Sequence, residues 1–406
     1  MVQRTPYGNL AALVTRPVTR RVKPDYDGGG IVNLMASIET AFGGRARYSA
    51  LRELAPDEIA GARNLCLLVI DGLGWRYLAR APGGGALRRH ARAPITSTFP
   101  TTTATAITTF MTGLAPQQHG LTGWHMYFRE LGAVLAVLPF RPRHGGPPIA
   151  VDGGVTPQGL LGNPPFADRL DAEAFVVSPF AIVDSVFNVA HSGRAQRVGH
   201  GGVDESFTAV RDIVRGSRGR SYVYAYYSEI DSLAHAHGIG SSEVRAELAR
   251  LDAAFGRLLE EIAGTDTLVV ATADHGFVDT RPETVVDLDD HPALAETLLI
   301  PLCGEPRVAY CYVKPGAHRA FEHYVETRLS HCASLAPSAD LLAQGWFGPG
   351  APHPRLADRI GDYALVMKDG YAIRDHVPGE RRHLQIGVHG GTSEDEMLVP
   401  LVVARV

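Results

Sequence analysis

Cysteine is scarce in this sequence, with four residues among 406 and no CxxC pair. Widely spaced cysteines in mainly apolar surroundings predict free buried thiols rather than a disulfide framework or a zinc knuckle. Any metal ion in this protein is therefore expected to be bound by Asp and His side chains. The four cysteines are Cys66, Cys303, Cys311 and Cys332.

Long apolar runs and a strong charge of either sign are also missing. No window holds the roughly 18 consecutive apolar residues of a membrane span, and residues 1–24 have no apolar segment long enough for a secretory signal. We therefore expect a cytoplasmic protein without a membrane partner. The formal net charge of −4 gives no reason to expect a nucleic acid polymer as partner, and the sequence predicts no oligomeric state.

Short apolar runs alternate with longer amphipathic segments along much of the chain. Such alternation is typical of strands and helices that build an α/β fold with a mostly parallel central sheet and helices on both faces. A long amphipathic helix is expected over residues 241–264. The expected strands are 66–70, 221–227, 267–273 and 397–404.

Two regions interrupt this alternation. Residues 128–200 are rich in Gly and Pro, whereas residues 300–385 contain strand and helix patterns of their own, at 307–313, 317–330 and 362–373. We interpret both regions as insertions, or caps, on a single α/β catalytic domain that spans residues 1–406.

Candidate metal ligands follow three of the apolar segments, in LLVIDGLGW, YYSEIDSLAHAHG and VVATADHGF, and a fourth lies in a glycine-flanked loop shortly before the last strand, in QIGVHGGTSEDEMLVP. In open α/β sheets, functional residues gather beyond the C-terminal ends of the strands. Each short motif is common by chance, but four in this position within one chain indicate a metal centre. The candidates are Asp71, Asp231, His235, Asp274, His275 and His389.

The number and type of these side chains suit two zinc-like sites. Zinc accepts imidazole and carboxylate ligands, and two ions about 3.5–4 Å apart can hold the attacking and leaving oxygens of a phosphoryl transfer. Asp231 and His235 are four residues apart, so both would lie on one helical face. His237 is an alternative to His235, although its spacing from Asp231 fits one face less well.

A threonine-rich segment, STFPTTTATAITTFMTG, spans residues 97–113. One of its hydroxyls could be a nucleophile, with Thr103, Thr102 and Thr98 as candidates. Alternatively, Thr101 or Thr102 caps a helix and Thr103 is only a residue of the first turn. A threonine hydroxyl is a poor nucleophile unless a metal ion or a base activates it.

Taken together, the motifs IDGLG, FPTTTATAITTFMTGLAPQQHGLTGW, DSLAH, ADHG and HGG followed by EM and VPLVV resemble the alkaline phosphatase superfamily, and most closely its type I phosphodiesterase/nucleotide pyrophosphatase branch. The resemblance covers residues 62–125, 220–280 and 385–406. It implies two divalent metal ions, of which zinc fits the ligand types. One ion would be bound by Asp71, Asp274 and His275 and would touch the nucleophile, and the other by Asp231, His235 and His389.

The resemblance also selects one threonine. In the family the nucleophile opens a helix nine residues before the threonine of a TG pair, which corresponds here to Thr103 before Thr112-Gly113. The family mechanism implies attack on phosphorus, a covalent phospho-threonine intermediate and its release by water. A free helix N-terminus would stabilise the phosphoryl charge.

The sequence departs from the family at one position. An asparagine that holds a phosphate oxygen usually follows the HG motif, and Trp124 stands there in this chain. The expected substrate contacts are therefore Thr122, Trp124 and His125. Arg141 or Arg143 from the following loop could also reach the substrate.

These residues predict a metal-dependent phosphodiesterase or nucleotide pyrophosphatase that acts on a small phosphate ester. A phosphomonoesterase or phosphonate hydrolase on the same scaffold is the alternative, because the asparagine is missing. A third hypothesis is a catalytically silent metal-binding protein, against which the complete ligand set argues. The sulfatase motif CxPxR is absent.

Overall fold

The computed structural model describes residues 21–82, 85–147, 149, 159–160, 163–380 and 385–406. Its body is a seven-stranded sheet in which five neighbouring strands run parallel and β18 runs antiparallel to both of its neighbours. The expected α/β fold with a mostly parallel sheet is confirmed. In spatial order the strands are β2 (Ala91–Thr96), β18 (Leu398–Arg405), β9 (Thr267–Thr272), β1 (Asn64–Ile70), β8 (Ser221–Tyr227), β6 (Glu173–Pro179) and β7 (Gln196–His200).

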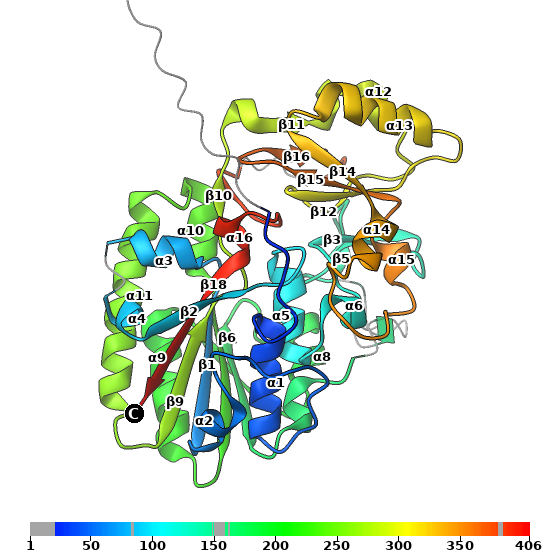
Figure 1. Ribbon diagram of the computed structural model, residues 1–406. Helices are drawn as coiled ribbons and strands as arrows, with labels where there is room; N and C mark the ends of the chain where they lie inside the picture. The colour runs from blue at the N-terminus through cyan, green and yellow to red at the C-terminus, as the bar shows by residue number, and fades with distance from the viewer. Residues whose placement is uncertain (1–20, 83–84, 148, 150–158, 161–162, 381–384) are drawn as a thin grey trace, which may run out of the picture.

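Helices cover both faces of this sheet (Figure 1). The helices α9 (Val203–Gly216) and α11 (Ser242–Glu261) pack on each other, whereas α1 (Ile31–Ala41) packs on α5 (Thr103–Thr112). Because helices lie on both sides, β1, β8 and β9 are buried along their whole length, which explains their continuous apolar runs.

The expected helix over 241–264 is α11, and its residues show why it forms. The Ser241 hydroxyl caps its first turn by accepting a hydrogen bond from the Val244 amide. Its buried apolar residues recur at intervals of three and four, which places them on one helical face. They are Val244, Leu248, Leu251, Phe255 and Leu258.

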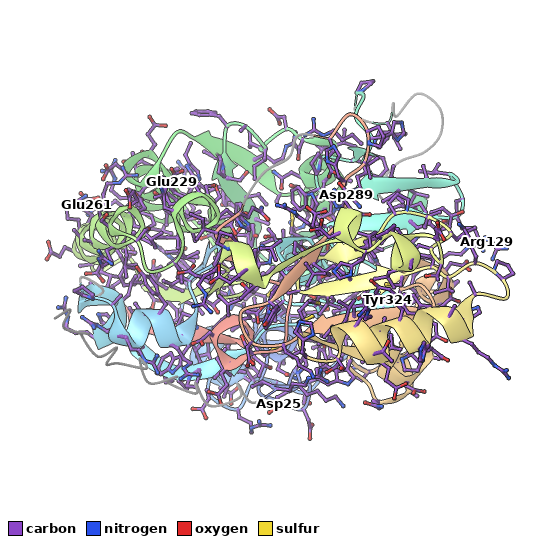
Figure 2. The ribbon with its side chains drawn as sticks, turned by 90° about the horizontal axis from the view of Figure 1, so that it is seen from above. Asp25, Arg129, Glu229, Glu261, Asp289 and Tyr324 are labelled. Atoms are coloured by element: carbon purple, nitrogen blue, oxygen red, sulfur yellow. The ribbon has the colours of Figure 1, made fainter. Side chains whose placement is uncertain are left out.

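A second seven-stranded sheet, antiparallel throughout, forms a cap beside the central sheet (Figure 1). Seen from above, Glu261 of the body and Arg129 of the cap lie at opposite ends of the molecule (Figure 2). Its strands are β14 (Ala333–Pro337), β15 (Tyr363–Met367), β13 (Val308–Cys311), β12 (Cys303–Glu305), β3 (His125–Phe128), β4 (Ala133–Ala136) and β5 (Arg141–Pro142).

The two parts of the cap join where Gly304 of β12 pairs with His125 of β3. A Cβ atom on Gly123 would lie 2.6 Å from the Cα atom of Gly304, so only glycine fits at position 123. Segments almost 180 residues apart in the sequence therefore form one sheet, and each reaches the edge of the body.

The structure divides the segment 128–200, which the sequence indicated as one insertion. β4 and β5 belong to the cap, whereas β6 and β7 continue the central sheet beyond β8. The apolar centre of EAFVVSP (173–179) is buried between neighbouring strands. Because the surrounding segment is rich in Gly and Pro, this strand was not predicted from the sequence. Residues 148, 150–158 and 161–162 of this segment lie outside the described residues.

The segment 300–385 also differs in detail from its sequence pattern. The strand expected over 362–373 consists of β15 and β16 (Ala372–Arg374), with Asp369 in the turn at a positive φ of 40°. The helix expected over 317–330 is α13 (His318–Tyr324) followed by a π-helical turn, Val325–Leu329. β16 pairs with β11 (Val285–Asp287), and β10 (Val278–Asp279) pairs with β17 (Gly387–Val388).

The remaining helices are short. Two of them, α10 and α16, carry or adjoin residues of the candidate site. The short helices are α2 (Pro56–Ala60), α3 (Trp75–Arg80), α4 (Gly85–Arg89), α6 (Pro116–His119), α8 (Val186–Ser192), α10 (Glu229–His237), α12 (Pro292–Ala295), α14 (Ser338–Ala343), α15 (Leu356–Arg359) and α16 (Glu394–Met397). All four cysteines are buried free thiols, as expected. Among the described residues, no helix is both long and apolar enough to cross a bilayer.

Candidate active site

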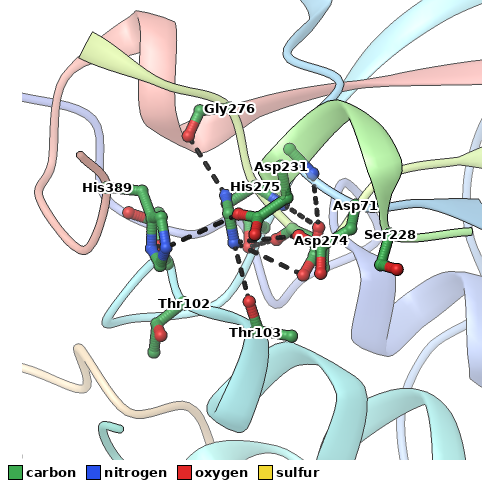
Figure 3. A network of polar contacts seen from close by, with 12 residues as sticks. Asp71, Thr102, Thr103, Ser228, Asp231, Asp274, His275, Gly276 and His389 are labelled. Carbon is green, nitrogen blue, oxygen red and sulfur yellow. Dashed lines mark hydrogen bonds and ion pairs between the residues drawn. The ribbon is translucent and has the colours of Figure 1, made fainter. Parts of the chain in front are cut away.

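Three neighbouring parallel strands bring the three candidate carboxylates to one edge of the central sheet, and His389 joins them from the loop after β17 (Figure 3). Asp71 directly follows β1, Asp274 lies in the loop after β9, and Asp231 lies in the first turn of α10, just after β8. The carboxyl ends of parallel strands meet at the same edge, where ligand sites of open α/β sheets are found. The three carboxylates therefore face one another.

Asp71, Asp274 and His275 form the first group of possible ligands, with their ligand atoms all within 4.8 Å of one another. His275 Nε2 lies 3.3 Å from Asp71 Oδ1 and 3.4 Å from Asp274 Oδ2. All three residues are buried. Among the described residues, neither of these carboxylate oxygens accepts a hydrogen bond, so both remain available to a cation.

Asp231, His275 and His389 form the second group, also within 4.8 Å. His389 Nε2 lies 3.9 Å from Asp231 Oδ1, and the His275 and His389 rings stack with centroids 3.7 Å apart. His235 lies one helical turn after Asp231, and its Nε2 is 3.4 Å from Asp231 Oδ1. His235 thus adjoins the second group, and His275 stands between both groups.

The three imidazoles are oriented in the same way. Each Nδ1 faces a backbone carbonyl oxygen, to which it can donate a hydrogen bond, and this leaves the Nε2 lone pair pointing toward the carboxylates. The contacts are His235 with Gly387 at 2.8 Å, His275 with Gly276 at 3.2 Å and His389 with Thr101 at 3.1 Å.

The electrostatics of the three carboxylates and three imidazoles favour the binding of a positive charge. Burial, followed by the charges of Asp231 and Asp274, raises the pKa of Asp71 well above its ordinary value, and burial lowers the pKa of His389 well below its own. No Lys or Arg in the described parts of the chain forms an ion pair with the three carboxylates. Carboxylates and neutral imidazoles without a cationic partner are the donor set that zinc-like ions prefer, so the residues fit divalent metal ions.

Thr103 is the first residue of α5, and its hydroxyl lies 3.1 Å from His275 Nε2 (Figure 3). The hydroxyls of its neighbours are engaged elsewhere, because Thr101 donates to the Gly391 carbonyl and Thr102 to Glu305. Thr98 is fully buried. Of these four threonines, Thr103 is the one that lines a cavity beside the cluster.

This cavity has a volume of about 870 Å³ and lies between the edge of the sheet with the candidate metal ligands and the cap. Trp124 and His125 line it, whereas Thr122 is fully buried and does not. Burial and the nearby charge of Arg143 lower the pKa of His125 to about 3, so this imidazole supplies no positive charge near neutral pH.

The two candidate arginines differ in what surrounds them. Arg143 is committed to Asp375 at 2.6 Å and Glu380 at 3.0 Å. Arg141 is exposed at the cavity, and its guanidinium has no ion pair or hydrogen bond within the described residues. Arg141 is therefore the arginine that remains free to meet a substrate.

Two residues of the cap that lie at or near the site, Glu305 and Arg307, were not predicted from the sequence. Glu305 at the end of β12 lines the cavity beside Thr102. Arg307 makes a two-armed ion pair with Glu396, at 3.0 Å for each arm. Neither residue belongs to a recognised motif, although Glu396 lies in the EM pair that follows HGG.

An α/β body with a buried Asp/His cluster at its parallel strand ends, and a hydroxyl facing that cluster, defines an alkaline-phosphatase-like enzyme. The family model described as "Type I phosphodiesterase / nucleotide pyrophosphatase" matches residues 65–392. The chain belongs to this family, and it is therefore a phosphoric ester hydrolase. No curated protein matches the chain.

Solved structures share the fold. Murine ectonucleotide pyrophosphatase/phosphodiesterase 5 superposes with a TM-score of 0.63 at 16% identity, covering 83% of this chain and 87% of that one. Phosphonoacetate hydrolase from Sinorhizobium meliloti 1021, in complex with phosphonoformate, gives 0.58 at 19% identity, covering 84% and 90%. At such identities the likeness establishes the fold.

Proposed function

We propose that this protein is a two-metal phosphodiesterase of the nucleotide pyrophosphatase type that uses Thr103 as its nucleophile. The observation that carries the proposal is the contact between the Thr103 hydroxyl and His275 Nε2, at 3.1 Å, at the start of α5. It joins a hydroxyl at a free helix N-terminus to a cluster of carboxylates and imidazoles that, among the described residues, has no Lys or Arg partner.

Two sets of residues would hold the metal ions, which we expect to be zinc. Asp71, Asp274 and His275 form one set, and Asp231, His235 and His389 form the other. When bound, such ions supply positive charge that offsets the carboxylates, activates a hydroxyl and stabilises the transition state of phosphoryl transfer.

The start of α5 would bind the phosphoryl group. Within the described residues, the backbone N–H groups of Thr103 and Ala104 have no hydrogen-bond partner, and such groups, with the helix dipole, favour phosphate oxygens. Thr103 Oγ1 forms a bond to phosphorus as the bond to the leaving oxygen breaks, and the leaving alcohol takes up a proton. The threonine adduct keeps the other ester group of the substrate, and water then breaks the bond between Oγ1 and phosphorus, releases a phosphate monoester and restores the hydroxyl.

A relative supports both the nucleophile and the substrate class. A second structure of murine ectonucleotide pyrophosphatase/phosphodiesterase 5, with a TM-score of 0.63 at 15% identity, is described as an inactive threonine-to-alanine variant in complex with AMP. The cavity of about 870 Å³ lies within the usual range for small ligands. We therefore propose a small phosphate ester, such as a nucleotide derivative, as substrate.

Hydrolysis of a phosphonate or a phosphomonoester is the second candidate. Trp124 in place of the family's asparagine favours it, as does the uncommitted Arg141 in the same cavity, which could bind a second anionic group. The likeness to phosphonoacetate hydrolase is consistent with this reading.

Turnover of an aryl phosphodiester, an aryl phosphomonoester and an aryl phosphonate, measured in parallel with the zinc content, tests the proposal. We expect the diester to be preferred and Thr103→Val to lose at least about a thousandfold in kcat, because the nucleophile is removed. Thr105→Val is the matched control, since Thr105 lies in the same helix but does not line the cavity. Preference for the monoester or phosphonate would support the second candidate, and full activity of Thr103→Val would refute the nucleophile.

A further inference from the structure

Glu305 is a carboxyl group of the cap that reaches the candidate active site. It ends β12, is 7% exposed, and lines the same cavity as Thr103, Asp231 and His389. An acidic side chain beside a site for an anionic substrate is unexpected, because like charges repel. Its hydrogen bonds indicate how it can be favourable there.

Both hydrogen bonds of Glu305 fall on the same oxygen. Oε1 accepts from the Thr102 hydroxyl at 2.5 Å and from the Trp124 backbone N–H at 2.7 Å. Among the described residues, Oε2 has no hydrogen-bond partner. It is also not among the fully buried polar atoms, so it is accessible. Two donors on one oxygen and none on the other suit a neutral carboxyl group whose second oxygen carries the proton.

The position of Glu305 is tightly held. A Cβ atom on Gly390, next to His389, would lie 2.5 Å from the Glu305 Cβ atom, so the two segments are in close contact. Two residues further along the chain, Arg307 is fully buried and forms its ion pair with Glu396, which also accepts a hydrogen bond from the Gly391 amide. Glu305 is thus fixed between the start of α5 and the loop of His389.

The position of Glu305 can be related to the asparagine that is usual in the family and missing in this chain. Its expected position is occupied by Trp124, and the Trp124 amide bonds to Glu305. We propose that Glu305 contacts the substrate directly and replaces that asparagine, with Oε2 donating a hydrogen bond to a non-bridging oxygen of the phosphoryl group. The inference rests on the proposed function, because it requires the phosphoryl group to lie against Thr103.

The electrostatic environment agrees with a neutral donor. Burial raises the pKa of Glu305 to about 7, even though the hydrogen bonds from Thr102 and Trp124 oppose the shift. An anionic phosphoryl group close to Oε2 favours the protonated form and acts against the opposite effect of bound divalent cations. In that form the carboxyl group offers the same kind of donor as an amide side chain.

Three variants of the zinc-loaded enzyme test the inference: Glu305→Ala, Glu305→Gln and Thr103→Ala. We expect Glu305→Ala to lower kcat/KM for an aryl phosphodiester by at least about a hundredfold, the lower end of the range for loss of one transition-state hydrogen-bond donor. Glu305→Gln should recover activity to within about fivefold of the unaltered enzyme, because the amide N–H still donates. Thermal melting shows whether each variant is folded.

A binding measurement gives a readout independent of turnover. Inorganic phosphate should bind about tenfold more weakly to zinc-loaded Thr103→Ala/Glu305→Ala than to Thr103→Ala, and Glu305→Gln in the same background should restore the affinity. The inference is overturned if Glu305→Ala stays within twofold of the unaltered enzyme, or if Gln is no better than Ala. If Thr103→Ala itself remains fully active, the proposed function fails instead.

Discussion

The Thr103 hydroxyl lies 3.1 Å from Nε2 of His275, although the two residues are 172 positions apart in the sequence. The contact exists because α5 begins at the same edge of the sheet as the loop after β9, which carries His275. It joins the start of a helix to the carboxylate and imidazole cluster, and the proposed chemistry depends on this junction.

Removal of metal ions is expected to lower the melting temperature as well as the activity. The carboxylates of Asp71 and Asp274 are buried and that of Asp231 is half-buried. A bound ion stabilises only the folded protein, by about 4 kcal/mol when free metal is a thousand times its Kd. Scanning fluorimetry with a chelator and then with added zinc checks this. Thr103→Val should show the same thermal shift, which separates stability from turnover. An unchanged melting temperature with no bound metal would argue for a metal-free protein.

His235 and His237 provide a matched pair on α10. His235 adjoins Asp231 at 3.4 Å, whereas His237 is exposed and does not line the cavity. We expect His235→Ala to reduce bound zinc by about one ion per chain and kcat by at least about a hundredfold, whereas His237→Ala retains both. Elemental analysis and steady-state kinetics measure the difference. Equal effects of the two substitutions would contradict the ligand assignment.

The ion pair between Arg307 and Glu396 is expected to make stability depend on pH. Burial alone would raise the pKa of Glu396, but the Arg307 guanidinium and its hydrogen bonds hold that pKa below its ordinary value of 4.5. A carboxylate with a lowered folded pKa stabilises the protein above its unfolded pKa, and the stabilisation is lost as the pH falls through the folded pKa. Urea unfolding between pH 7 and pH 3 should show this decline.

Replacement of one partner tests the same pair directly. Arg307→Ala should lower the free energy of unfolding by about 3–5 kcal/mol, because it leaves the buried Glu396 charge without a partner. Its slope of stability against pH below pH 5 should be flatter than that of the unaltered protein. A loss under 1 kcal/mol would show that the pair contributes little to stability.

Gly123→Ala tests the junction within the cap. The added methyl group would meet the Gly304 backbone at 2.6 Å, so the segments that carry Trp124 and Glu305 must separate. We expect a lower melting temperature and a lower kcat/KM. Gly219→Ala is the control, because no atom lies within 4 Å of the added group and its φ is not positive. If both variants behave alike, the close contact has no functional role.

The central sheet and the proximity of the Asp and His side chains could be predicted because their signals are local, whereas their role as metal ligands stays a prediction. Runs such as CLLVI before Asp71 reflect a strand buried on both faces, and the ligand loops follow such strands directly. The i,i+4 spacing of Asp231 and His235 is likewise a property of one helix. The catalytic role of Thr103, the metal identity and the cytoplasmic location stay predictions.

The cap could not be predicted because its determinants are long-range. β12 and β3 pair across almost 180 residues. β6 lies in a segment rich in Gly and Pro, and this composition obscures its short strand pattern. Glu305 enters the site only through that pairing, so no spacing within its own segment marks it. The antiparallel direction of β18 depends on its neighbours β2 and β9, which a single strand pattern does not reveal.

Chemical trapping of the proposed intermediate tests the account most directly. The zinc-loaded enzyme would be mixed with an aryl phosphodiester, quenched in acid within the first turnover, digested, and analysed by mass spectrometry of the peptide that contains residues 97–113. The account predicts an adduct on Thr103 in which the phosphorus atom still carries the remaining ester group of the diester, absent from Thr103→Val and present in Thr105→Val. Rapid turnover without any adduct, or an adduct on Thr98 or Thr102, would contradict it.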